Sequence, residues 1–359
     1  DLEIDPARKR ATCSPGVITK DLLDAASKHD LTFPPDPASF EESTIGGNVA
    51  ENAGGLRCKR FGVVKDYVIG LRAVLADGSV IETGVFNQSA TFALHDLLIG
   101  SEGTLAIITK IAVQLIPTPS LGTTILVAFD NPKNAAQTVA DIVRSGMILT
   151  VMEYLDGDAA DCSNQYEKTE GLDRAAAILL LETTGEEKAT QTTAIKKLCL
   201  ANNCTYLRIE SDPAAAEHLW AVRRNLSLAI KEIADYRISE DVAVPISRFP
   251  ILVSYVADLN HASMLRINGF GHAGDGNLHV TFMAQHRTPD EMGLMKTEIR
   301  KLLEKAIQLG GTLTGEHGIG LAKREYLHLE FDRATLDLMK SVKLTLDPTG
   351  LLNPGKIFS

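Results

Sequence analysis

The sequence contains no long hydrophobic run and no cluster of basic residues. No uninterrupted apolar stretch approaches the roughly 20 residues of a membrane-spanning helix, so we expect no transmembrane segment. The formal net charge is -10, from 36 lysines and arginines against 46 aspartates and glutamates. An acidic chain without a Lys/Arg run is a poor candidate for nucleic acid binding, because phosphate contacts need clustered cations.

Paired cysteines are also lacking. The five cysteines are scattered, and none forms a CxxC pair (Cys13, Cys58, Cys162, Cys199 and Cys204). Such a set predicts no disulfide framework and favours a reducing compartment. We therefore expect a cytoplasmic protein, free or peripheral to the inner membrane, or a mitochondrial one in a eukaryote.

There is no apolar signal region and no starting Met, and the chain opens on a strand-like LEID. This opening predicts that the chain begins inside a domain.

The length of 359 residues suits two domains. Residues 1–118 are rich in glycine and short apolar runs, and Asp77-Gly78 predicts a hairpin between two strands. After PTPS at 117–120, strand patterns alternate with helical ones, which predicts a second α/β or α+β domain over 119–335. A final helical stretch runs into a Pro/Gly-marked tail, and we treat 336–359 as that tail.

The strands and helices of the second domain can be placed individually. We expect strands at 123–129, 151–156, 176–183, 205–211 and 238–245. A helix over 131–146 has Asn131 as its cap and Pro132 at its first position, and a longer one starts at Pro213 and runs to 234.

Two glycine-rich segments of the first domain could bring backbone close to a ligand. Residues 44–55 read TIGGNVAENAGG. Glycine frees N–H groups to point at an anion, and asparagine can donate to and accept from a heterocycle edge. A tight double turn without a ligand is the alternative. GSEGT at 100–104, before an apolar strand, is a weaker signal of the same kind.

The sharpest pattern is GHAGDGNLH at 271–279. A turn between strand-like INGF and VTFM would fold the chain back, so that His272 and His279 could reach one point. Glu316 stands downstream beside His317. Two histidines and one carboxylate form the ligand set of a catalytic metal site, and zinc, manganese or iron would suit it. Ordinary surface or core histidines are the alternative.

Residues 269–274 also match G-x-G-x-x-G, the dinucleotide fingerprint. That fingerprint requires glycines that open a helix, whereas a turn and a strand follow here. We therefore reject a nicotinamide site. Arg223, after Trp220 on the predicted helix, could clamp a carboxylate, or it could be part of a solvated helix face together with Arg224.

Taken together, these segments resemble the FAD-linked oxidases of the vanillyl-alcohol-oxidase/PCMH superfamily. Within it they are most similar to the branch that contains glycolate oxidase, D-lactate dehydrogenase and D-2-hydroxyglutarate dehydrogenase. Seven segments carry the resemblance in the family's order: PPDP at 34–37, STIGGNVAENAGG at 43–55, GSEGTLAIIT at 100–109, EDVAVP at 240–245, GHAGDGNLH at 271–279, GEHGIG at 315–320 and LNPGK at 352–356.

The resemblance implies an α+β chain. A partial PCMH-type FAD-binding domain would span 1–118, an α+β substrate and metal domain with a large antiparallel sheet would span 119–335, and the tail would return to the FAD domain. The implied activity is oxidation of a small D-2-hydroxy acid to the 2-oxo acid. The hydride would go to FAD, and a divalent metal would assist. The implied electron acceptor is an iron–sulfur subunit, a quinone, a cytochrome or an electron-transfer flavoprotein, and a homodimer is left open.

The resemblance also assigns roles to residues. It makes His272, His279 and Glu316 metal ligands, His317 the base and Arg223 the holder of the substrate carboxylate, with Asn277 lining the site. Ten residues would lie near FAD: Pro34, Gly46, Gly47, Asn48, Asn52, Gly54, Gly55, Gly103, Ile108 and Asn353.

Two features depart from the family's pattern. No Gly-rich pyrophosphate loop stands before residue 34, so we expect an N-terminally incomplete member, and Ala106 replaces a usual glycine. Two other functions stay open at this point. One is a non-catalytic assembly subunit that is unable to hold FAD, and the other is a metal-dependent hydrolase that uses the same histidines without flavin.

Overall fold

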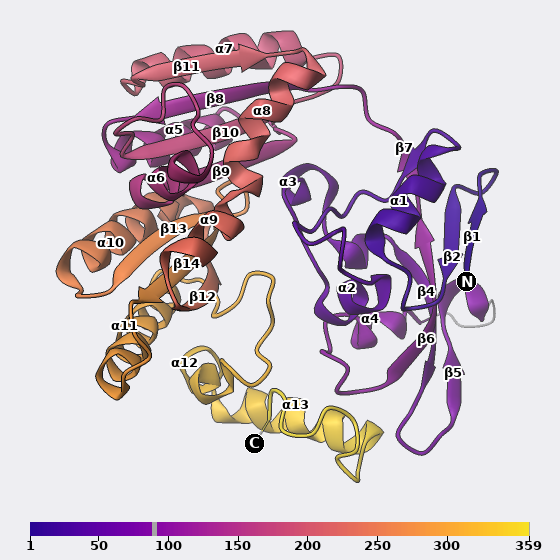
Figure 1. Cartoon of the computed structure of the whole chain (residues 1–359). Coiled ribbons are helices and arrows are strands. Elements are labelled where there is room, and N and C mark those ends of the chain that lie inside the picture. The colour runs from indigo at the N-terminus through magenta and orange to yellow at the C-terminus, as the bar shows by residue number, and fades with distance from the viewer. Residues whose placement is uncertain (88–91, 359) are drawn as a thin grey trace. The chain divides into compact units, whose positions relative to one another are not determined.

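The computed structural model describes residues 1–87 and 92–358, which form two compact units. Unit 1 comprises residues 1–118 and 316–359, and unit 2 comprises residues 119–315 (Figure 1). The expected boundary at 335 therefore differs from the observed division, in which residues 316–335 group with the N-terminal part of the chain.

Unit 1 contains a five-stranded antiparallel sheet in the order β1-β2-β6-β4-β5 and a separate β3-β7 pair. The strands are β1 (Leu2–Asp5), β2 (Arg10–Cys13), β3 (Leu31–Thr32), β4 (Val68–Val74), β5 (Val80–Glu82), β6 (Ile107–Gln114) and β7 (Ile116–Pro117). The predicted hairpin is confirmed, since β4 and β5 pair across a turn in which Gly78 has φ +85°.

The helices of unit 1 cover this sheet with apolar side chains. Leu22 and Ile45, from two different helices, are fully buried in one core with Leu71 of β4 and Ile111 of β6. The helical segments are α1 (Thr19–Ser27), α2 (Ile45–Glu51), α3 (Cys58–Phe61), η1 (Val64–Asp66), η2 (Gly84–Phe86), α4 (His95–Leu98), η4 (Arg324–Tyr326), α12 (Leu327–Glu330) and α13 (Arg333–Leu346).

Lys343 links the C-terminal segment to the N-terminal part of unit 1 through hydrogen bonds. Its ammonium group donates to the carbonyl oxygens of Thr104 at 2.7 Å and Leu352 at 2.8 Å, and it pairs with the buried carboxylate of Asp347. Val342 and Leu346 of α13 also pack against the unit 1 core. These contacts explain why the chain after residue 316 belongs with residues 1–118.

Unit 2 is built on a seven-stranded sheet in the order β11-β8-β10-β9-β13-β14-β12, and every neighbouring pair is antiparallel. The expected large antiparallel sheet is confirmed. Its strands are β8 (Thr123–Phe129), β9 (Val151–Asp156), β10 (Ala177–Thr183), β11 (Tyr206–Glu210), β12 (Tyr236–Ala243), β13 (Arg266–His272) and β14 (Asn277–Ala284).

Helices pack on both faces of this sheet, so β8, β10 and β14 are buried along their whole length. Leu126 and Ala128 of β8 share one core with residues of α6, α8 and α9. The helical segments are α5 (Pro132–Arg144), α6 (Gly157–Tyr166), α7 (Lys188–Ala201), α8 (Pro213–Arg224), α9 (Leu226–Ile233), η3 (Ile246–Arg248), α10 (Phe249–Ala262) and α11 (Pro289–Gln308).

The predicted start of α5 is confirmed, with the Asn131 side chain accepting from the Lys133 amide at 3.0 Å and Pro132 in the first turn. The single helix expected over 213–234 is wrong, because it is divided at Asn225. Asparagine is unfavourable inside a helix, because its short polar side chain forms hydrogen bonds that compete with those of the helical backbone. Here the Asn225 side chain donates to Glu167 at 2.6 Å.

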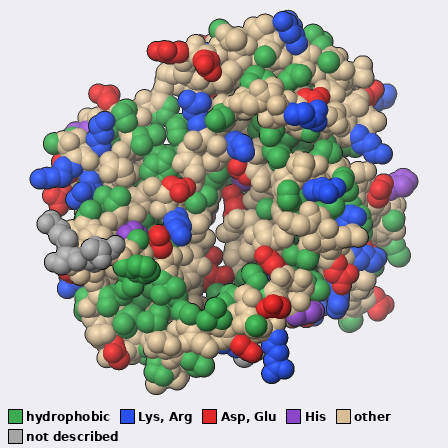
Figure 2. Space-filling view, turned by 180° about the vertical axis from the view of Figure 1, so that it is seen from behind, with side chains coloured by type: hydrophobic (Ala, Val, Ile, Leu, Met, Phe, Trp, Pro, Cys, Tyr) green, Lys and Arg blue, Asp and Glu red, His purple; other side chains and the backbone are tan. Residues whose placement is uncertain are grey.

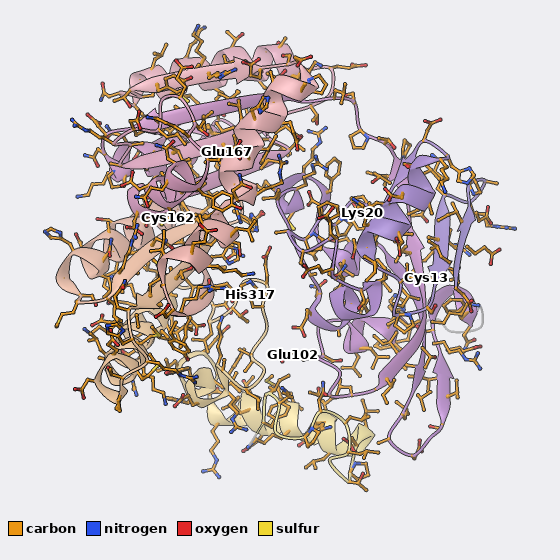
Figure 3. The ribbon with its side chains drawn as sticks, in the orientation of Figure 1. Cys13, Lys20, Glu102, Cys162, Glu167 and His317 are labelled. Atoms are coloured by element: carbon orange, nitrogen blue, oxygen red, sulfur yellow. The ribbon has the colours of Figure 1, made fainter. Side chains whose placement is uncertain are left out.

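The five cysteines are free thiols, as their spacing predicts. Cys13 is buried in unit 1 and Cys162 in unit 2 (Figure 3). Among the described residues, no helix is both long and apolar enough to cross a membrane. On the face drawn in Figure 2, acidic and basic side chains are interspersed.

Candidate metal and flavin site

One face of the unit 2 sheet gathers polar residues from four neighbouring strands. His272 pairs directly with Glu153 of β9, Phe270 pairs with His279 of β14, and His279 pairs with Asp241 of β12. Cross-strand partners point to the same face of a sheet, and so do residues two apart in one strand. The strand register therefore sets both imidazoles and two carboxylates in one row on that face.

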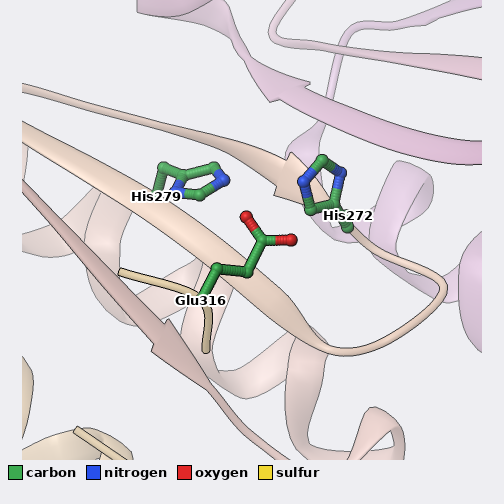
Figure 4. A group of neighbouring side chains, drawn as sticks. All are labelled: His272, His279 and Glu316. Carbon is green, nitrogen blue, oxygen red and sulfur yellow. The ribbon is translucent and has the colours of Figure 1, made fainter. Parts of the chain in front are cut away.

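His272, His279 and Glu316 form a group that could hold a metal ion (Figure 4). One donor atom from each lies within 4.8 Å of the others, and the two imidazole rings are 5.4 Å apart between centroids. Donors that share one zinc ion lie roughly 3.4 Å apart, given Zn–N and Zn–O distances near 2.1 Å in tetrahedral geometry. Small side-chain rotations would close that difference, and the donor set fits a divalent metal.

The turn between the two histidines depends on glycine at position 276. Gly276 has φ +75°, and a Cβ built on it would lie 2.0 Å from the Val244 carbonyl oxygen. The chain can therefore reverse between β13 and β14 only if this residue has no side chain, which brings His272 and His279 onto adjacent strands.

We expect Gly276→Ala to destabilise the protein and to weaken zinc binding together. The clash with Val244 adds to the roughly 1–2 kcal/mol that a left-handed backbone costs an L-residue. Gly78→Ala is the matched control, since Gly78 has φ +85° but nothing within 4 Å of its Cβ position. Thermal unfolding and zinc titration of both variants are the measurements. Equal destabilisation by the two changes would contradict the expectation.

Glu153 is a site residue that the sequence reading missed. It is fully buried, and its Oε1 lies 2.5 Å from His272 Nδ1 while its Oε2 accepts from Arg223 Nε at 2.7 Å. Burial alone would raise the pKa of Glu153, but its interactions with His272 and Arg223 outweigh this effect and lower the pKa to about 2. A lone glutamate inside the apolar strand VMEYL was the available signal, because buried carboxylates are rare unless paired.

Arg223 lies on α8 over the same face of the sheet and is buried. Its guanidinium carbon stands 5.0 Å from the centre of the Phe270 ring, a cation–π distance. The Nε atom is occupied by Glu153. Arg224, the next residue, instead pairs with Glu217 at an exposed position. The structure therefore brings Arg223, but not Arg224, into contact with the residues around His272.

The loop after α11 carries Glu316 and His317, of which Figure 3 labels His317. Carboxylates accept hydrogen bonds from this loop on either side of these two residues. Within unit 2, Asp241 accepts from the Gly315 amide at 2.7 Å and from the Thr314 hydroxyl at 3.1 Å. Within unit 1, Glu102 accepts from the amides of residues 319 and 320, both at 2.7 Å. Glu316 is partly buried, whereas the side chain of His317 is exposed.

Asn277, the first residue of β14, packs against this loop. A Cβ on Gly315 would lie 2.7 Å from the Asn277 side-chain amide, so residue 315 has no room for a side chain. The Oδ1 atom of Asn277 is buried and has no hydrogen-bond partner in the described part of the chain. An unpaired buried acceptor costs about 1–3 kcal/mol, which a bound ligand or water would recover.

The residues expected near FAD come from four segments, and unit 1 brings these segments together. The Gly100 amide donates to Val49 and the Glu102 amide to Ala50, so that the 100–103 loop lies against α2. Asn353 donates to the Glu102 carbonyl and stands beside Gly103. The segment after Pro34 reaches the second glycine pair, because a Cβ on Gly55 would meet the Asp36 carbonyl oxygen at 2.3 Å.

The structure changes the interpretation of several of these residues. Gly46 and Gly47 lie in the first turn of α2, capped by Thr44, and not in a double turn. Gly46 lets that helix approach Pro15, at 2.4 Å from its Cβ position. Asn48 donates to Thr19 at 2.7 Å, and Asn52 ends the helix in a left-handed conformation.

Gly54 has a specific neighbour too, since a Cβ there would lie 2.6 Å from Glu316 Oε1. Ile108 is half-buried on β6. Gly54 and Gly55 are buried, whereas Gly47 is exposed in the first turn of α2 and Gly103 is partly exposed in the adjoining loop. Backbone without a side chain is therefore accessible to a flat cofactor at these two positions. Gly47 and Gly103 thus fit the approach of FAD, whereas Gly46, Gly54 and Gly55 pack against other parts of the chain.

The G-x-G-x-x-G match at residues 269–274 lies on β13 and in the turn after it, as expected. These glycines do not begin a helix, as the dinucleotide fingerprint would require.

Comparison with known proteins matches this chain to FAD-linked oxidases. The family model for FAD linked oxidases, C-terminal domain, matches residues 118–357, and an FAD binding domain model matches residues 1–84. The structure of p-cresol methylhydroxylase with substrate bound has a TM-score of 0.77 at 15% identity, covering 99% of this chain and 77% of that one. A 4-ethylphenol oxidase from Gulosibacter chungangensis has a TM-score of 0.75 at 16% identity, with 99% and 77% coverage. The expected PCMH-type fold is confirmed.

Three curated relatives are similar along nearly the whole chain. The GlcD subunit of glycolate oxidase from Bacillus subtilis is 40% identical, covering 100% of this chain and 77% of its own length. D-lactate dehydrogenase of Archaeoglobus fulgidus is 34% identical, with 99% and 79% coverage. D-2-hydroxyglutarate dehydrogenase of Stutzerimonas stutzeri is 30% identical, with 100% and 79% coverage.

The fold and the matched domains define an FAD-linked oxidoreductase of the PCMH type. The chain belongs to the family of FAD-linked oxidases, and its named relatives are glycolate oxidase subunits and D-2-hydroxy-acid dehydrogenases.

Proposed function

We propose that this protein oxidises a small D-2-hydroxy acid of the lactate, glycolate or 2-hydroxyglutarate class to the 2-oxo acid, with FAD as hydride acceptor. The observation that carries the proposal is the grouping of His272, His279 and Glu316 beside the buried Arg223. A 2-hydroxy acid presents a hydroxyl and a carboxylate on adjacent carbons. This site offers a metal-ligand set for the hydroxyl and a guanidinium for the carboxylate.

His272, His279 and Glu316 would hold the divalent metal, which supplies Lewis acidity that lowers the pKa of a hydroxyl group. FAD supplies the two-electron redox chemistry and would lie on the unit 1 surface that includes Gly47, Gly103 and the neighbouring segments. The name of the matched FAD binding domain and the accessible backbone at Gly47 and Gly103 support this assignment.

The side chains of the chain itself bind and orient the substrate. Arg223, held at Nε by Glu153, presents the rest of its guanidinium fork to the substrate carboxylate and so fixes the direction of the Cα–H bond. Asn277 offers its unpaired Oδ1 as an acceptor at the site. His317, next to Glu316, takes the hydroxyl proton as general base while the Cα hydrogen leaves as hydride. The two electrons then require an acceptor, which would be an iron–sulfur subunit, a quinone, a cytochrome or an electron-transfer flavoprotein.

An anaerobic absorption spectrum of the purified chain, reconstituted with FAD and zinc, tests the proposal. We expect a flavin band between roughly 350 and 500 nm that bleaches when D-lactate, glycolate or D-2-hydroxyglutarate is added, because hydride transfer removes the oxidised chromophore. The same bleaching should disappear after the metal is chelated. A bound flavin that none of these acids reduces would contradict the proposed substrate class. Failure to bind flavin at all would favour the assembly-subunit alternative.

A further inference from the structure

Glu153 stands between two residues to which the proposed function gives separate tasks. One carboxylate oxygen contacts the ring nitrogen of His272 and the other accepts from the guanidinium of Arg223. The side chain is completely buried, at 0% exposure, so no solvent competes for either oxygen. The carboxylate is thus a bridge between a predicted metal ligand and a predicted substrate-binding residue.

The pairing of β9 with β13 places Glu153 next to His272, so this contact follows from the backbone of the sheet as well as from the side-chain rotamers. Glu153 on β9 is the direct cross-strand partner of His272 on β13, so the backbone register sets their distance. The flanking residues 151, 152, 154 and 155 are all buried. An apolar side chain could be buried in this strand without the desolvation free energy that a carboxylate loses. A buried carboxylate is stable only when its hydrogen-bond and ion-pair partners remain in place. A purely structural position gives no reason to place a carboxylate here.

On the histidine side, the contact selects one tautomer. A carboxylate accepts, so the Nδ1 atom of His272 must carry the hydrogen, which leaves the lone pair on Nε2 for a metal ion. A carboxylate behind a ligating histidine also fixes the ring orientation and makes the imidazole a stronger ligand.

On the arginine side, the contact fixes a plane. The Nε–H of Arg223 donates to Glu153, and the guanidinium carbon lies 5.0 Å from the centre of the Phe270 ring. These two contacts restrain the guanidinium group and therefore the direction in which its outer nitrogens point. That direction is set by the same carboxylate that orients His272.

We propose that Glu153 is a positioning residue that couples the metal-binding imidazole of His272 to the carboxylate-binding guanidinium of Arg223. This inference rests on the proposed function, since it assigns Glu153 to the same site. Glu153 touches neither metal nor substrate in this role. It acts by holding one ring tautomer and one guanidinium orientation at the same time.

Zinc affinity, measured by competition of the full-length protein with a chromophoric chelator, tests the inference without turnover. Glu153→Gln keeps the shape but replaces one acceptor oxygen with an NH2 donor, so it cannot accept from both partners. We expect zinc to bind about 10–100-fold more weakly. The KM for D-lactate should also rise, because Arg223 loses its anchor. Zinc is a suitable probe because divalent zinc binds imidazole and carboxylate sites more tightly than manganese or iron do.

Two further variants keep the test decisive. Glu298→Gln is the matched control, since Glu298 is a buried carboxylate of α11 that is ion-paired to Lys301 at 2.9 Å. We expect it to leave zinc affinity unchanged. Glu153→Asp keeps the charge but is one methylene too short to bridge both partners, and it should weaken zinc binding even if Glu153→Gln does not fold. Circular dichroism of each variant establishes that it is folded.

The outcomes separate this inference from the function on which it rests. If folded Glu153→Gln or Glu153→Asp protein binds zinc within twofold of the parent while His279→Ala does not, the positioning role of Glu153 is wrong and the metal site stands. If His279→Ala binds zinc as tightly as the parent, the metal site itself is wrong, and the inference fails with it.

Discussion

Replacing His317 with alanine is expected to lower the turnover number for D-2-hydroxy acids by about 10²–10⁴-fold, the usual contribution of a general base. The imidazole directly follows the predicted ligand Glu316 on a loop held by Asp241 and Glu102, so its removal should leave the loop in place. Bound metal and flavin should therefore stay at the parent level. Steady-state kinetics, together with metal analysis and a flavin spectrum, provide the measurement.

The control for His317 is His328→Ala, because His328 is an exposed histidine elsewhere in unit 1, on α12. It should leave turnover, metal and flavin unchanged. Turnover of His317→Ala near the parent value would show that another group takes the hydroxyl proton. Loss of metal from His317→Ala would instead assign this histidine a role in metal binding.

The second large effect is expected at Arg223. Arg223→Met removes the only charge that we assign to the substrate carboxylate, and losing one partner of a buried charge pair costs 2–5 kcal/mol. We expect kcat/KM to fall by about 10²–10³-fold, measured with D-lactate. Arg223→Lys should recover little of this loss, because an ammonium group lacks the planar fork of a guanidinium.

Arg224→Met is the control for this change, since Arg224 is the neighbouring arginine and its ion pair with Glu217 is exposed. Exposed pairs contribute little, so kcat/KM should stay within about twofold of the parent. An equal loss in both variants would mean that general charge near α8 matters, and not the bridge to Glu153. Zinc content should persist in Arg223→Met, which distinguishes substrate binding from metal binding.

The local elements of this fold follow from short stretches of sequence. The Asp77-Gly78 turn, the Asn131-Pro132 helix start and the strands at 123–129 and 151–156 were all predicted where they occur. Turn chemistry and caps act over a few residues, so a sequence window contains what decides them. The same local reasoning failed at Asn225, where a contact with Glu167, far away in the sequence, accompanies the break in the helix.

The domain organisation was only partly accessible from sequence. Prolines mark the boundary after residue 118, whereas no proline stands near residue 316, where the chain returns to unit 1. That return depends on Glu102 accepting from two loop amides and on Lys343 donating to the Thr104 carbonyl. Both contacts span more than 200 residues, so no local pattern records them.

The sequence by itself determined the candidate ligands His272, His279 and Glu316, because their residue types and turn-rich surroundings are visible without a structure. Only the tertiary structure decided that Glu153 belongs with them. Its position opposite His272 comes from the pairing of β9 with β13, and its contact with Arg223 comes from the packing of α8 on the sheet. Strand register and helix packing depend on the whole core at once, and a shift of one residue would turn Glu153 to the other face.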